Sequence, residues 1–253
     1  MVSGSPHQQT PLPSGVGTPP PAPAGVRVWL RRYRRYLPMP LCLIALVGLR
    51  PIALWGSMWL DTLTDALGVG LCALGQGLRL WAWGSNAEVG KGGVRMRGPY
   101  ALMRHPLYAG NFLILLGLVV IFNNPWAYPL FLLPFAYLYH VITDMEEKRM
   151  HRRFGADYQE YEGRAVPRFL PVLGNLGIAL RTTLPFGWEL AWRKEGESCC
   201  GWLAGVVVLE AYEGVLARGW AQNWPYTQRW LVVLGLISAL ALSLQVHKRL
   251  KPV

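Results

Sequence analysis

The sequence predicts an all-α, polytopic membrane protein with about six transmembrane helices. Of its 253 residues, 52% are hydrophobic and 15% are charged, whereas about 25% of the residues of a soluble domain are charged. In addition, the stretch 105–143 contains no Asp, Glu, Lys or Arg. We expect membrane helices at the segments 37–55, 65–83, 107–122, 126–143, 201–217 and 230–246.

The N-terminal part divides into a tail and a first membrane segment. Residues 1–26 contain seven prolines, four glycines and no charge, so they cannot build a core and are predicted to be disordered. Residues 27–64 form an N-terminal membrane segment, whose span is interrupted by Arg50 and Pro51. Because the first basic cluster follows the tail, we expect a retained span and no signal peptide.

The uncharged stretch is too long for a single membrane helix. A bilayer core of about 30 Å needs about 20 residues of helix, and the run Asn-Asn-Pro at 123–125 is a turn signal. The segments 107–122 and 126–143 are therefore expected to form a central helical hairpin. Its two charged ends then lie at the same membrane face.

The region 172–253 is predicted to add a second helical hairpin. Its first span contains Glu210 and Glu213, three residues apart on one helical face. Acidic groups are costly inside a membrane. We expect this span to lie partly in the interface, and the alternative is that the two acids line a substrate path.

The basic residues predict the orientation. If both termini are cytoplasmic, all of the 25 Lys and Arg residues except Arg50, Arg218 and Arg229 lie on the cytoplasmic side. We expect an integral protein of a prokaryotic cytoplasmic membrane. This bias also explains the net charge of +11, so we expect membrane lipids and no nucleic acid as partners.

Neither a disulfide framework nor a metal site is expected. Two of the four cysteines lie in predicted spans, and Cys199 and Cys200 are adjacent. One face of a continuous helix would carry His140, Asp144, Glu147 and His151. Di-iron bundles draw Glu-x-x-His ligands from two helices, and this chain has no second set of such residues.

Two polar clusters flank the central hairpin. The first is R-H-P-L-Y-A-G at 104–110, preceded by G-P-Y at 98–100. The second begins with E-E at 146–147 and continues with F-G-x-x-Y-x-x-Y at 154–161 and R-F-L-P at 168–171. Each cluster alone is compatible with interfacial anchoring. A cation and an imidazole opposite two carboxylates favour a site for a zwitterionic ligand.

In this combination, residues 65–171 resemble the membrane methyltransferases that include isoprenylcysteine carboxyl methyltransferase and phospholipid N-methyltransferases. The run L-R-L-W-A-W at 78–83 is also similar. The resemblance implies S-adenosylmethionine as cofactor in a cytoplasm-facing pocket. It implies that the cofactor is bound by Tyr100, Arg104, His105, Pro106, Tyr108, Gly110, Glu146, Glu147, Tyr158 and Tyr161.

The positions of these residues suggest their roles. Arg104 and His105 would meet the methionine carboxylate, and Glu146 or Glu147 would accept a hydrogen bond from its ammonium group. The tyrosines would surround the adenine and the sulfonium, because aromatic faces attract a cation.

The expected acceptor is lipid-like or isoprenylated. Methyl transfer from a sulfonium cancels charge, so a dry and aligned site accelerates it. Arg168 could hold a carboxylate acceptor, which needs no base. Glu147 or His105 would have to deprotonate an amine acceptor. Arg168 and Glu147 are therefore the candidate catalytic residues.

Two other functions remain open. The same fold could serve as a structural or accessory subunit of a larger membrane complex, with region 172–253 as its docking face. Alternatively, the chain could be a membrane lipid or sterol reductase that binds a nicotinamide cofactor without a Rossmann fold.

Overall fold

The computed structural model describes residues 44, 48–51, 58–89, 92–164 and 166–250. The predicted tail 1–26 and most of the predicted span 37–55 lie outside these residues. The described part of the chain is helical and contains no strand. Its long helices are α3 (Met58–Gly84), α4 (Pro106–Phe122), α5 (Ala127–Phe154), α8 (Trp188–Arg218) and α9 (Trp220–Leu250). Its short helices are η2 (Gly98–Ala101), α6 (Ala156–Gly163), η3 (Leu173–Asn175) and α7 (Leu176–Arg181).

The long helices coincide with five of the predicted spans, but they differ in character. By length and composition, α8 and α9 are the described helices able to cross a membrane, and α4 is a shorter apolar helix. The helix α3 carries two acidic residues, Asp61 and Asp65, near its start. The helix α5 continues beyond its apolar part into the charged residues that end at Phe154.

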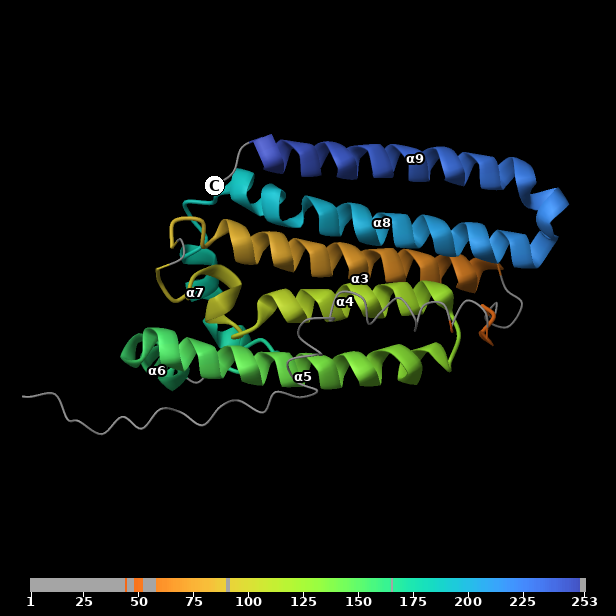
Figure 1. Cartoon of the computed structure of the whole chain (residues 1–253). Helices are drawn as coiled ribbons and strands as arrows, with labels where there is room; N and C mark the ends of the chain where they lie inside the picture. Colours follow the sequence, from red (N-terminus) through yellow and green to blue (C-terminus); the bar gives the residue numbers. More distant parts are fainter. Residues whose placement is uncertain (1–43, 45–47, 52–57, 90–91, 165, 251–253) are drawn as a thin grey trace, which may run out of the picture.

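The five long helices lie side by side in the order α5, α4, α3, α8, α9, and neighbours run antiparallel (Figure 1). The ends of α3 and α5 and the starts of α4 and α8 therefore meet at one end of the layer. The short helices gather at this same end (Figure 1). This arrangement places the loops that carry the polar clusters next to one another.

The central hairpin turns where the sequence predicts it. Asn123 has a left-handed conformation with φ 48° and ends α4, a conformation that Asn tolerates better than most residues. The Asn124 side chain accepts a hydrogen bond from the Trp126 amide at 2.9 Å and donates one to the Arg50 carbonyl at 2.7 Å. The first bond satisfies an amide at the start of α5 that has no helical partner, and the second joins the turn to Arg50.

The helices α3 and α4 approach closely through glycines. A Cβ atom on Gly110 would lie 2.7 Å from the carbonyl oxygen of Gly75, and one on Gly117 would lie 2.6 Å from the Cys72 Sγ atom. Both distances are too short for ordinary contact, so only glycine allows this packing. The contact fixes α4 against α3 next to the loops that carry the polar clusters.

The second predicted hairpin is formed by α8 and α9. Gly219, with φ 76°, separates the two helices, and α8 packs against α3. Glu210 and Glu213 lie on α8 in half-buried positions. The apolar part of α9 is not buried inside the protein, so its side chains form an apolar surface.

Candidate functional site

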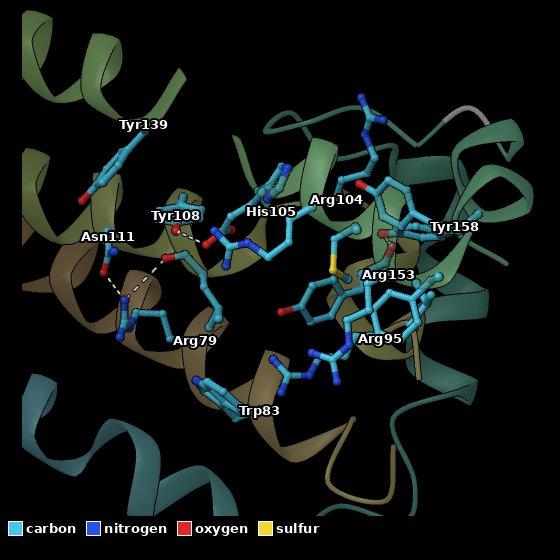
Figure 2. Close-up of a pocket in the computed structure, with 18 of the residues that line it drawn as sticks. Arg79, Trp83, Arg95, Arg104, His105, Tyr108, Asn111, Tyr139, Arg153 and Tyr158 are labelled. Atoms are coloured by element: carbon cyan, nitrogen blue, oxygen red, sulfur yellow. Dashed lines mark hydrogen bonds between the residues drawn. The ribbon is translucent and has the colours of Figure 1, made fainter. Parts of the chain in front are cut away.

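A cavity of about 730 Å³ lies where α3 and α5 end and α4 and α8 begin (Figure 2). This volume is within the usual range for small-molecule sites. Most of the predicted cofactor residues line it, namely Tyr100, Arg104, His105, Tyr108, Glu146, Tyr158 and Tyr161. The structure thus brings together residues from both polar clusters.

Backbone hydrogen bonds join the two polar clusters. The amide of Arg104 donates to the Pro167 carbonyl at 2.8 Å, and the amide of His105 donates to the Arg168 carbonyl at 3.0 Å. The segment before α4 therefore runs beside the R-F-L-P segment. This pairing places the Arg168 side chain near the start of α4.

Glu147 is the centre of a buried ionic network. Its side chain contacts His105 Nε2 at 3.1 Å, Arg168 Nη2 at 2.5 Å and Arg104 Nη2 at 3.4 Å, and the residue is 5% exposed. Burial raises the pKa of Glu147, but these partners outweigh it and lower the pKa from 4.5 to about 2. Glu147 is therefore an ionised carboxylate that holds three cationic or imidazole groups together.

The predicted catalytic pair lies next to the cavity, outside its lining. The Nε and Nη2 atoms of Arg168 donate hydrogen bonds to the two carboxylate oxygens of Glu147. Neither residue is among those that line the cavity. Their proposed catalytic roles remain predictions. A carboxyl group with a pKa near 2 is a weak base at neutral pH.

Of the two adjacent glutamates, Glu146 lines the cavity and Glu147 does not. The hydroxyl of Tyr108 donates to its Oε1 atom at 2.8 Å, and the ring of Tyr108 lies 5.2 Å from that of Tyr139. Figure 2 shows Tyr108, His105 and Tyr139 around one side of the cavity. This side combines a carboxylate, an imidazole and two aromatic rings.

The other tyrosines form a buried aromatic wall. Tyr158 and Tyr161 are each 3% exposed, and the Tyr161 hydroxyl donates to the Tyr100 carbonyl at 2.7 Å. Burial raises the pKa of Tyr158 to about 12 and also raises the pKa values of Tyr100 and Tyr161. All three side chains are therefore neutral phenols at physiological pH.

Two further predicted cofactor residues, Pro106 and Gly110, do not line the cavity and instead shape and pack α4. Pro106 is buried in the first turn of α4, where a missing amide proton costs nothing. Gly110 faces α3, since a Cβ atom there would meet the Arg79 side chain at 2.6 Å. The close approach that glycine permits here is to the neighbouring helix.

The cavity also contains residues that the sequence interpretation did not assign to the site. They include Arg79, Trp83, Arg95, Asn111, Tyr139, Arg149, Arg153, Lys194 and Glu195. Arg79 and Trp83 belong to the L-R-L-W-A-W run, which was a usable signal. Glu195 follows its ion-pair partner Arg79 by 116 residues, and nothing in the local sequence marks it.

The residues with metal-like spacing on α5 have other partners. Asp144 pairs with Lys148 at 2.9 Å, and His151 pairs with Glu162 at 2.8 Å. Among the described residues, no group of three or more His, Cys, Asp or Glu side chains is arranged to hold a metal ion.

These features define a helical membrane protein with a polar and aromatic cavity at one end of its helices. Residues 63–157 match the family model described as phospholipid methyltransferase. This match covers 95 of the 253 residues and agrees with the resemblance to isoprenylcysteine carboxyl and phospholipid membrane methyltransferases that the motifs indicate. The matched segment contains most of α3, all of η2, α4 and α5, and the first residues of α6.

Two relatives have names that refer to metal resistance. The cobalt-zinc-cadmium resistance protein CzcN of Cupriavidus metallidurans is 31% identical over 122 residues, which are 47% of this chain and 54% of the relative. The nickel-cobalt-cadmium resistance protein NccN of Alcaligenes xylosoxydans xylosoxydans is 30% identical over 124 residues, which are 46% and 56%. The chain spans about half the length of these curated relatives. No solved structure matches the chain.

Proposed function

We propose that the chain is an integral membrane methyltransferase that binds S-adenosylmethionine and methylates a lipid-like or isoprenylated acceptor. The family match supports methyl transfer in general. The observation that carries the proposal is the cavity wall, where Glu146, His105 and aromatic rings from both polar clusters converge. A bound S-adenosylmethionine would supply an electrophilic methyl group on a sulfonium.

The lining residues fit the charges of this cofactor. Glu146 is oriented by the Tyr108 hydroxyl and would accept hydrogen bonds from the ammonium group. Arg104 and His105 line the same cavity and would bind the carboxylate. The rings of Tyr108 and Tyr139 present aromatic faces, which stabilise a sulfonium by a cation–π interaction.

In this proposal Glu147 acts as an orienting counter-ion. It contacts Arg104 and His105, so their side chains are held in place before the ligand arrives. Because the lining groups are positioned in advance, little ordering is needed when the cofactor binds, which favours the aligned geometry of an in-line displacement.

The excess of cations in the cavity favours an acceptor with an anionic group. Arg95, Arg149 and Lys194 line the cavity, and none of them forms an ion pair with a described carboxylate. Arg95 and Lys194 instead lie 4.3 and 5.4 Å from the ring centroid of Trp83. Among anionic acceptors a carboxylate is favoured, because its methylation needs no base and Glu147 is a weak base.

The test is direct binding of S-adenosylmethionine to the purified full-length chain in detergent, measured by isothermal titration calorimetry. We expect saturable binding that Glu146→Gln weakens by about tenfold or more, which corresponds to about 1.4 kcal/mol. Glu160→Gln is the matched control, because Glu160 is exposed and pairs with Arg164. Absence of saturable binding by the unmodified chain would overturn the proposal.

A non-catalytic accessory role is the second candidate. The apolar surface of α9 and the metal-resistance names of the relatives favour it. Cells that express Glu146→Gln distinguish the two functions. An accessory subunit would keep full tolerance to cobalt, zinc and cadmium with this variant and would copurify with a stoichiometric partner. No described feature favours a lipid or sterol reductase.

A further inference from the structure

Glu195 is a buried carboxylate that α8 contributes to the cavity wall. It is 1% exposed. Its Oε2 atom accepts a hydrogen bond from Arg79 Nε at 2.6 Å, and its Oε1 atom accepts one from Arg79 Nη2 at 3.0 Å. Gln76 Nε2 adds a longer contact at 3.4 Å. The helix α8 lies outside the segment 63–157 that matches the family model.

Arg79, which lies on α3, also contacts two residues of α4. Its Nη1 atom donates to the side-chain oxygen of Asn111 and lies 3.5 Å from the Leu107 carbonyl oxygen. Figure 2 shows Arg79 bonded to Asn111 beside Tyr108. A bidentate ion pair fixes the plane of a guanidinium, so Glu195 determines where the Nη1 atom of Arg79 points.

The first turns of α4 carry ligand-facing groups. Tyr108 lies between the two α4 residues that Arg79 contacts, and its hydroxyl donates to Glu146 on α5 at 2.8 Å. His105 immediately precedes α4 and also lines the cavity. A continuous set of contacts therefore runs from α8 through α3 and α4 to α5.

We propose that Glu195 is a positioning residue, which acts through Arg79 to fix the start of α4 and hence His105 and Tyr108. The α8–α9 hairpin is then part of the working unit of the cavity, in addition to any role as a membrane anchor. The identity of the ligand rests on the proposed function. The positioning itself is a property of the ligand-free chain and is measurable without a ligand.

The first measurement is hydrogen–deuterium exchange of the full-length chain in detergent, followed in the peptide 105–112. We expect Glu195→Gln to increase amide exchange in this peptide, because Arg79 then loses its ionic partner. Glu195→Asp should restore part of the protection. Glu197→Gln is the matched control two residues further along α8, where Glu197 pairs with Lys248 in an exposed position. Unchanged exchange with Glu195→Gln would overturn the inference.

The second measurement is the dissociation constant of S-adenosylmethionine for the same variants. We expect Glu195→Gln to weaken binding by about tenfold, or about 1.4 kcal/mol, because His105 and Tyr108 are then less well positioned. Glu195→Gln combined with Arg79→Gln should weaken binding no more than Arg79→Gln alone, because Glu195 acts through Arg79. A purely structural role would lower the melting temperature and leave the dissociation constant unchanged, which would contradict the inference.

The two measurements separate this inference from the proposed function. If exchange in 105–112 increases with Glu195→Gln and no variant binds S-adenosylmethionine, the positioning role stands and the proposed cofactor is wrong. If the unmodified chain binds the cofactor and Glu195→Gln binds it equally well, the proposed function stands and the positioning role is wrong.

Discussion

Glu147 links the polar residues on both sides of the central hairpin. The sequence places its carboxylate opposite Arg104 and His105, because the hairpin returns the chain to the same end. The structure adds Arg168 as a further partner. This addition was not predictable from spacing, because it depends on backbone hydrogen bonds between residues 104–105 and 167–168.

The lowered pKa of Glu147 predicts how stability depends on pH. Its pKa is 4.5 when unfolded and about 2 when folded, so its contribution is complete above pH 4.5 and is lost as the pH falls towards 2. Glu147→Gln should lower the free energy of unfolding by about 3 kcal/mol at pH 7. We expect the difference between the two proteins to shrink below pH 4.5 in chemical denaturation. A difference that is constant from pH 7 to pH 3 would contradict this account.

The cations of the cavity predict a selective effect on the acceptor. Arg149→Gln and Lys194→Gln should each raise the KM of an anionic acceptor by about tenfold, or about 1.4 kcal/mol, and leave the dissociation constant of S-adenosylmethionine unchanged. Steady-state methyl transfer provides the KM values. Arg152→Gln is the control, because Arg152 is exposed on α5, the helix that carries Arg149. Equal effects of all three variants would show that only the overall charge matters.

At the scale of elements, the helical hairpin was the most predictable feature. The uncharged stretch, the run Asn-Asn-Pro and the charged flanks located α4 and α5 within a few residues, apart from the charged continuation of α5 to Phe154. The packing partner of each helix was not predictable, because apolar residues occur on all faces of α4. The structure shows that glycines bring α3 and α4 together.

The contact between α3 and α4 predicts opposite effects of two glycine substitutions. Gly110→Ala should lower the free energy of unfolding by about 1–3 kcal/mol, because its Cβ atom would overlap Gly75 and the Arg79 side chain. Gly77→Ala on α3 has nothing within 4 Å and should be neutral or stabilising by up to about 1 kcal/mol. Thermal unfolding in detergent compares them. Equal melting temperatures would argue against close packing at Gly110.

At the scale of the whole molecule, the cavity needs both halves of the chain. Residues 63–157 match the family model and supply most of the lining, but Lys194 and Glu195 come from α8. The motifs in the sequence placed no residue of region 172–253 among the predicted site residues. It could not do otherwise, because a contact between residues 116 positions apart leaves no local pattern.

The measurement that tests the central claim most directly is transfer of a labelled methyl group. The purified chain is incubated with methyl-tritiated S-adenosylmethionine and a total membrane extract, and label is followed into the lipid phase and into extracted prenylated species. We predict time-dependent incorporation that S-adenosylhomocysteine inhibits and that Glu146→Gln strongly reduces. Incorporation that is absent, or equal in the unmodified chain and Glu146→Gln, would contradict the assignment of this cavity as a methyltransferase site.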